Sequence, residues 1–424
     1  MGAMREPETW DKRKVVTPTS LHLTKTIKLK LGLSIGESFY MNRGAYKILV
    51  ALVIAIYCST MYTCKPRPSK IVKLEDTVRV QKQIVNFYIE NSGSMKGYFA
   101  GNSQIKDVIK EYYDRIDERA NKGDTITLNY INTEIENSPN DIKGFLLNSQ
   151  NKCTAPYTKI DDILSMAMES LNDSTVNIVI SDYCFTSNNG SFSMAQSGIT
   201  ELFAKRLKDD ADLSVAIIKY MSDFNGLYYP GGIRNNKPLP FYLWIFGNES
   251  QVKRIVNVPI KTPQCGLLVL QTNQSVKRDI KVKKARMVED DAIIVKEWSK
   301  DRNRESTIYS LSLEMDMSRV ILPKEEICDI TKYQVTEGYS IESISNKEGE
   351  VFSYKITTGK PSPGKLSIAY IQQDLPEWVE KSNYTGTGVP KDSTTLGVKY
   401  LIGGVYDAYH NLSSKVFETK IALK

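Results

Sequence analysis

The chain has 424 residues, of which 41% are apolar and 25% charged, so it is long enough for two or more folded domains and does not have the composition of a disordered protein. Its net charge of +7 is confined to one end, because residues 1–70 hold twelve Lys and Arg against four Asp and Glu, and the remaining 354 residues carry −1. A nucleic-acid-binding face is therefore not expected in the main body. With only His22 and His410 in the sequence, zinc sites and catalytic triads built on histidine are nearly excluded.

Residues 41–64 carry the pattern of an export signal or a membrane anchor. Arg43 and Lys47 precede an apolar run, Ile48 to Met61, whose 14 residues are fewer than the roughly 17–25 that a spanning helix needs. The stretch "MYTC" at 61–64 is similar to a bacterial lipoprotein box. Thr63 departs from the small residue usual there, so a lipidated Cys64 and an uncleaved anchor both stay open.

The position of this segment predicts how the N-terminal part is organised. A signal normally lies close to the start of a protein, so residues 1–40 are expected to be an upstream extension and residues 65–83 a linker. Under either interpretation of residues 41–64 the protein is exported and held at a membrane. Its main body is then expected to face the periplasm or the extracellular space.

From residue 84 to about 260, strand patterns and helix patterns alternate. Strands are expected at 84–89, 124–131, 142–148, 175–183, 213–220 and 241–246, the third of them pairing with the second. Helical spacing of apolar residues predicts helices over 105–116, 160–171, 199–207 and 251–256. Strands that alternate with helices predict an α/β domain with a doubly wound, mostly parallel sheet over residues 84–260.

After residue 262 the pattern changes to that of a β-rich domain, 262–424. "YSLSLEMDM" (309–317) alternates apolar and polar residues strictly, as a half-buried strand does. Residues 351–371 read as two strands joined by a Pro/Gly turn, and 394–411 is ambiguous because three glycines weaken a helix prediction. A sandwich is one arrangement that fits such short strands.

Oxygen-bearing side chains follow the ends of two predicted strands. The first strand runs directly into Glu90-Asn91-Ser92-Gly93-Ser94, and the strand from 175 ends at Asp182. Thr158 lies just before the second predicted helix. Ligands bind outside the carboxyl ends of strands in open α/β sheets, and hydroxyl and carboxylate oxygens suit Mg²⁺ or Mn²⁺. We therefore predict a metal site formed by Glu90, Ser92, Ser94, Thr158 and Asp182.

This arrangement resembles the von Willebrand factor A-type domain over residues 84–256. In that family an Asp-x-Ser-x-Ser motif ends the first strand, and together with a later Thr and Asp it forms a metal-ion-dependent adhesion site that takes a carboxylate from a partner protein. "SGSM" (92–95) matches the usual continuation, while Glu90 replaces the first Asp and Tyr183 stands where a glycine often follows the second. The resemblance implies a non-enzymatic protein-binding module, in which Glu90 is one methylene longer than the aspartate of the motif.

Other interpretations of the same residues stay open. The serines could cap a turn or a helix, and Thr158 with Asp161 fits a capping box. A metal-dependent hydrolase and a metal-free scaffold are the alternative functions. Cys153 and Cys184, which flank the predicted site, are expected to form a disulfide if the loops that carry them are neighbours.

Overall fold

The structure is a computed structural model that describes residues 82–185, 191–229, 231–272, 280–282, 285–288, 292–295, 299–303, 306–386 and 393–423. These residues all belong to one compact unit, Val78–Lys424. The expected extension, the signal or anchor segment and nearly all of the linker lie outside the described residues. Within the described part, no helix is long and apolar enough to cross a membrane.

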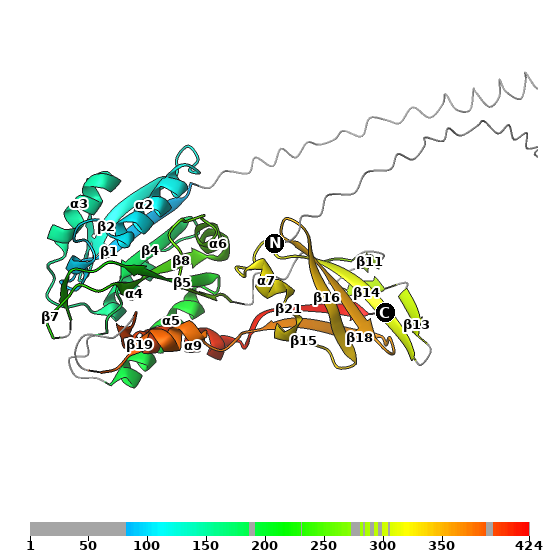
Figure 1. Cartoon of the computed structure of the whole chain (residues 1–424). Coiled ribbons are helices and arrows are strands. Elements are labelled where there is room, and N and C mark those ends of the chain that lie inside the picture. The colour runs from blue at the N-terminus through cyan, green and yellow to red at the C-terminus, as the bar shows by residue number, and fades with distance from the viewer. Residues whose placement is uncertain are drawn as a thin grey trace, which may run out of the picture. The chain divides into compact units, whose positions relative to one another are not determined.

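A seven-stranded sheet forms the centre of the first domain (Figure 1). Its strands, in their order across the sheet, are β3 (Ile135–Asn137), β2 (Thr125–Ile131), β1 (Ile84–Glu90), β4 (Thr175–Ser181), β8 (Leu239–Asn248), β5 (Leu213–Ser222) and β9 (Gly266–Leu270). β1 pairs in parallel with β2 and β4, so β1, β2, β4 and β5 share one direction. The α/β class is thus confirmed, with a mixed sheet.

The strand at 241–246 is an exception within the mixed, mostly parallel sheet. β8 lies between β4 and β5 and runs antiparallel to both. The connection from β5 to β8 contains the hairpin of β6 (Gly226–Tyr228) and β7 (Ile233–Asn235), and its described residues contain no crossover helix. A parallel return needs such a crossover, so the chain comes back in the opposite direction.

The segment 142–148, predicted as a strand, is part of helix α3 (Ile142–Lys152). Asp141 caps this helix, because its side chain accepts a hydrogen bond from the Gly144 amide at 2.7 Å. The buried residues of α3 follow a helical period: Ile142, Phe145, Leu146 and Ser149. The short apolar run is compatible with both strand and helix periodicity, and the Asp141 cap favours the helix.

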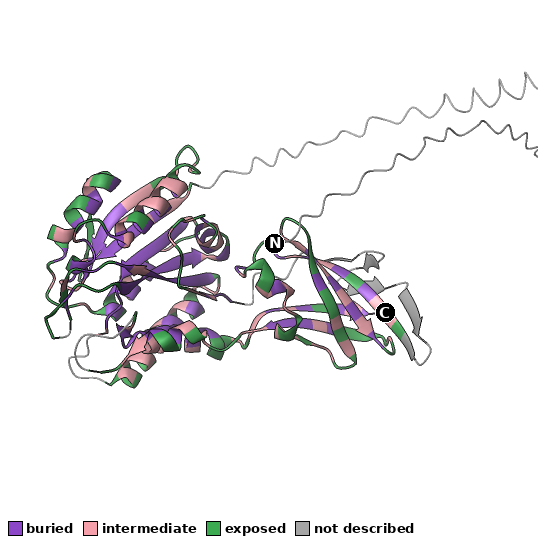
Figure 2. Ribbon diagram, in the orientation of Figure 1, coloured by how far each residue is buried: buried purple, intermediate pink, exposed green. Residues whose placement is uncertain are grey.

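Helices cover both faces of the sheet. One apolar core contains residues of α2 (Gln104–Asp117), α3 and α6 (Glu249–Val256), and the other contains residues of α4 (Ile160–Glu169), α5 (Phe192–Asp209) and α9 (Val398–Leu412). Figure 2 shows the sheet as the most deeply buried part of this domain. The predicted helix at 105–116 is confirmed, with its apolar residues buried at the expected spacing.

Residues late in the chain complete this first domain. β9 pairs with β5 in the sheet, and α9, the segment left ambiguous by its glycines, packs on α5. A Cβ atom on Gly404 would lie 2.6 Å from the carbonyl oxygen of Gln196, so the two helix backbones approach closely. Helix α8 (Glu377–Ser382) and the paired strands β19 (Asn383–Tyr384) and β20 (Thr395–Leu396) add Val379 and Leu396 to the two cores. The domain therefore extends beyond residue 260.

The remaining residues form two five-stranded sheets around a third core. One sheet holds β10 (Ile280–Val282), β14 (Ser306–Asp316), β17 (Val351–Thr358) and β16 (Tyr339–Glu348), with β13 (Ser299–Asn303) also on β14. The other holds β11 (Ala285–Val288), β12 (Ala292–Val295), β21 (Lys415–Leu423), β18 (Gly364–Ile371) and β15 (Tyr333–Val335). Short helices α7 (Lys324–Cys328) and η3 (Ile330–Lys332) precede β15. Both sheets contribute to the core, as in a sandwich.

Candidate metal-binding site

The five predicted site residues gather at the carboxyl edge of the central sheet. β1 and β4 are parallel neighbours with Ile89 opposite Ile180, so Glu90 and Asp182 reach the same edge. Residues 153–158 are attached to this edge by backbone hydrogen bonds, from Gly93 to the Ala155 carbonyl at 2.9 Å and from Ala155 to the Asn91 carbonyl at 3.2 Å. These bonds bring the loop before α4 beside the turn after β1.

Hydrogen bonds connect the five residues into two groups that meet at Ser92. Glu90 Oε1 accepts from the Ser92 amide at 2.9 Å and from the Thr158 hydroxyl at 2.5 Å. The hydroxyls of Ser92 and Ser94 lie 2.9 Å apart, and Ser94 hydrogen-bonds Asp182. The structure thus brings together all the residues that the sequence singled out, while a role as metal ligands stays a prediction.

The two carboxyl groups at this edge are buried without a counter-cation. Glu90 is 0% and Asp182 5% exposed. Burial, followed by the nearby charge of Asp182, raises the pKa of Glu90 to about 7, against the lowering effect of its hydrogen bonds from Ser92 and Thr158. Burial also raises the pKa of Asp182. Among the described residues no Lys, Arg or His forms an ion pair with either group, so negative charge here is uncompensated.

The turn after β4 holds Asp182 in place through an unusual backbone conformation. Tyr183 has φ of +48°, in the left-handed region that favours glycine. Its amide donates to the Ser181 hydroxyl at 2.9 Å, and its ring stacks on Trp244 at 4.5 Å between centroids. A tyrosine thus adopts a backbone conformation that favours glycine, and its ring is buried against Trp244.

Thr158 and Ser94 do not act as helix caps, which was the alternative to a role in the site. The N-cap residue of α4 is Lys159, which makes no side-chain capping bond, whereas the Thr158 hydroxyl donates to Glu90. Ser94 precedes the short helix η1 (Met95–Gly97) and also makes no capping bond. Both hydroxyls are therefore used within the cluster and not by a helix.

The disulfide expected between Cys153 and Cys184 is not formed. Both thiols are free and buried in the same apolar core. The Cys184 thiol donates to the carbonyl oxygen of Tyr229 at 2.9 Å, toward the β6–β7 hairpin. Burial is the main cause that raises the pKa of both thiols above its usual range. The prediction was wrong, and the two cysteines pack as small apolar side chains.

Two residues that the sequence analysis did not single out complete the site. The Ser181 hydroxyl donates to Glu90 Oε2 at 3.3 Å, and the side-chain oxygen of Asn91 is buried without a hydrogen-bond partner. Their positions in the sequence could have identified them, because Ser181 directly precedes Asp182 and Asn91 lies within the motif. Within the described residues this amide oxygen is therefore a buried acceptor left unsatisfied.

The donor set fits a hard cation better than a soft one. Three hydroxyls and two carboxylates are the oxygen ligands that Mg²⁺ and Mn²⁺ take. Within the described ranges, no three His, Cys, Asp or Glu side chains form a group that could hold a metal, so a cation here would depend on the hydroxyls of Ser92, Ser94 and Thr158. The chemistry available is therefore cation-assisted binding of an anionic group.

No protein-family model, no curated protein and no solved structure matches this chain.

Proposed function

We propose that the first domain is a von Willebrand factor A-type module that binds a partner protein at its carboxyl edge, through a site that is metal-ion-dependent or derived from such a site. One arrangement carries the proposal. The Ser92 and Ser94 hydroxyls form a hydrogen-bonded chain to Asp182, and the Thr158 hydroxyl donates to Glu90. Both carboxyls are buried, and neither forms an ion pair with a described cationic residue. A divalent cation would compensate the charge of these carboxyls. Its open position would take a carboxylate of the partner.

Two features distinguish this domain from the A-type pattern. The antiparallel strand β8 interrupts the order of strands that a mostly parallel sheet would have. Glu90 is one methylene longer than Asp, and its carboxylate already accepts the hydroxyl hydrogen of Thr158 at 2.5 Å. The Thr158 oxygen keeps its lone pairs while it donates this hydrogen, so it can still face a cation. If the longer carboxylate leaves too little room for the ion, the domain is a metal-free scaffold with the same edge.

The place of action follows from the N-terminal segment. Residues 41–64, with their basic start and apolar centre, support export and attachment to a membrane, with the module facing the periplasm or the extracellular space. A protein partner in that compartment, reached through an acidic side chain, fits the site. The near-neutral charge of residues 71–424 gives no support to a nucleic-acid partner.

A metal-dependent hydrolase is the second candidate, and one observation favours it. Glu90 has its pKa raised to about 7 by burial and by Asp182, which is the range of a general base at neutral pH. Against it, the only histidine of the described residues is His410, in α9. Hydrolysis of a panel of ester and phosphoester substrates in Mg²⁺, absent in Asp182→Ala, would support this candidate.

The test of the proposed site is calorimetric titration of the purified protein with Mg²⁺ and Mn²⁺. We expect binding to be lost in Asp182→Ala and tightened in Glu90→Asp, because the shorter carboxylate leaves room for the cation. Asp161→Ala is the matched control, since this exposed aspartate lies in the first turn of α4 beside the site. If neither the parent nor Glu90→Asp binds either ion, the site is metal-free.

A further inference from the structure

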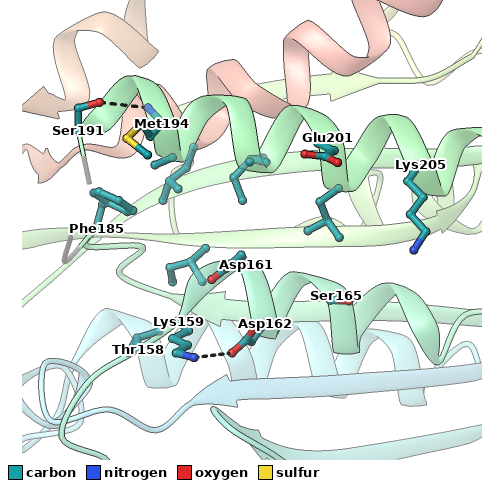
Figure 3. A pocket seen from close by; sticks show the side chains of 16 residues that line it. Thr158, Lys159, Asp161, Asp162, Ser165, Phe185, Ser191, Met194, Glu201 and Lys205 are labelled. Atoms are coloured by element: carbon teal, nitrogen blue, oxygen red, sulfur yellow. Dashed lines mark hydrogen bonds and ion pairs between the residues drawn. The ribbon is translucent and has the colours of Figure 1, made fainter. Parts of the chain in front are cut away.

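A groove of about 610 Å³ runs between helices α4 and α5, starting beside the candidate site (Figure 3). Thr158 and Lys159 lie at its start, where the loop enters α4, and Phe185 and Met194 lie near the same end. Lys205 marks the opposite end on α5. The groove is therefore continuous with the edge of the sheet that carries the site residues.

Gly198 leaves space in this groove, although no neighbouring helix or strand comes close enough to require a glycine there. It lies in the middle of α5 and lines the groove, and a Cβ atom built on it would have no atom within 4 Å. Glycine inside a helix costs about 1 kcal/mol relative to alanine. Gly404 on α9 shows the contrast, because there a Cβ atom would collide with α5. The space above Gly198 is thus free for a group that this domain does not supply.

The lining of the groove combines an apolar floor with walls that carry three carboxylates and two lysines, Lys159 and Lys205. Ile199 and Leu401 are buried beneath it, while Met194 is 68% exposed, an adaptable apolar contact for a bound side chain. Asp161 on α4 and Glu201 on α5 stand on its two walls, and neither forms an ion pair with a described residue. The walls hold three carboxylates, Asp162 being the third, and Lys159 is paired with Asp162 at 3.6 Å.

We propose that this groove binds an amphipathic helical segment of the partner protein, with apolar residues over Met194 and Gly198 and a lysine or arginine between Asp161 and Glu201. The proposal rests on the proposed function, since Thr158 makes one partner able to reach both the site and the groove. A helix laid into a groove between two helices is a recurrent mode of recognition. At 1.5 Å per residue, a helical segment of about 14 residues covers nearly all of the 15 positions from Ser191 to Lys205.

The test uses a fluorescein-labelled peptide of 14 leucines and lysines, with leucine at helical spacing, and a scrambled peptide of the same composition. Binding to the full chain is followed by fluorescence anisotropy in Mg²⁺ and in EDTA. We expect the amphipathic peptide to bind more tightly than the scrambled one. Gly198→Leu places an apolar side chain in the groove from a position whose Cβ meets no atom within 4 Å, and it should weaken this binding at least tenfold, about 1.4 kcal/mol.

The matched control is Ser197→Leu, which places the same side chain on the next residue, exposed and outside the groove lining. It should stay within twofold of the parent, and Glu201→Lys should weaken binding through its reversed charge. Circular dichroism confirms that each variant is folded. Equal binding of the two peptides, or equal binding by the parent and Gly198→Leu, overturns the proposal.

Two further outcomes have distinct meanings. A dimer in analytical ultracentrifugation that Gly198→Leu dissociates would show that a second copy occupies the groove, which also overturns the proposal. Because the peptide carries no acidic side chain, Asp182→Ala should still bind it, and Gly198→Leu should still bind Mg²⁺. These two variants therefore distinguish failure of the groove proposal from failure of the metal-site proposal.

Discussion

Replacing Glu90 by glutamine should stabilise the metal-free protein in alkaline solution far more than in acid. Glu90 is fully buried, and burial together with the charge of Asp182 raises its pKa from 4.5 to about 7. Between these two values the folded protein keeps a proton that the unfolded chain has released. The stability contributed by this group is therefore complete below pH 4.5 and is lost as the pH rises through 7. At roughly 1.4 kcal/mol for each pH unit, the loss is about 3 kcal/mol.

The glutamine variant is suited to this test because its shape and most of its hydrogen bonds are retained. Its amide oxygen can accept from Ser92 and Thr158, and its amide nitrogen can donate to Ser181. Urea unfolding in EDTA gives the free energy of unfolding of parent and variant at pH 4.5 and pH 8. The difference between them should grow by about 3 kcal/mol in favour of the variant. Apart from Asp182, whose charge interacts with Glu90, the titratable groups common to both proteins contribute equally, so a difference that does not change with pH refutes an uncompensated buried carboxyl at position 90.

Three other predictions follow from contacts and burial. Gly404→Ala should lower the free energy of unfolding by about 1–3 kcal/mol, because the new methyl group meets the carbonyl of Gln196, and urea titration measures this loss. Iodoacetamide should alkylate the exposed Cys265 long before the buried Cys153 and Cys184, whose thiol pKa values burial raises, as peptide mass spectrometry will show. Mg²⁺ should bind more tightly as the pH rises toward 7, because the cation displaces the proton that Glu90 holds, and calorimetry at several pH values will detect this.

Each of these predictions has a clear contrary result. Gly404→Ala with the stability of the parent would mean that α5 and α9 are further apart than the structure has them. Early alkylation of Cys184 would mean that the edge of the sheet opens in solution. A magnesium affinity that is constant from pH 5 to pH 8 would mean that the cation does not contact the buried carboxyls.

The sequence predicted the parts of the fold that local patterns determine. The apolar runs of β1 and β4 and the helical spacing of α2 and α4 appear in the structure within a few residues of their expected bounds. What it could not predict depends on contacts between distant segments. The direction of β8 and the position of α9 on α5 are decided by packing across the sheet, and no local pattern encodes them.

The sequence predicted that the five candidate residues lie together, but it did not predict the electrostatics of the carboxyls or the contact of Ser181 with Glu90. A motif at the end of one strand and an aspartate at the end of its parallel neighbour must meet, so Ser94 and Asp182 come together from topology alone. The spacing of Cys153 and Cys184 suggested a bond for the same reason, but the direction of each side chain lies beyond such reasoning. The long carboxylate of Glu90 turning toward Thr158 is likewise a property of the folded turn.

The late position of α9 has a consequence for synthesis on the ribosome. α5 ends at Asp209 and the helix that covers it ends at Leu412, so about 200 residues are translated between the two. At roughly 5–20 residues per second this interval lasts about 10–40 s. During that time the nascent sheet domain presents an uncovered apolar flank, and export before folding or a chaperone bound to α5 would protect it. A chain truncated before α9 would have a nearly complete sheet and a permanently exposed apolar surface on α5, which would favour aggregation.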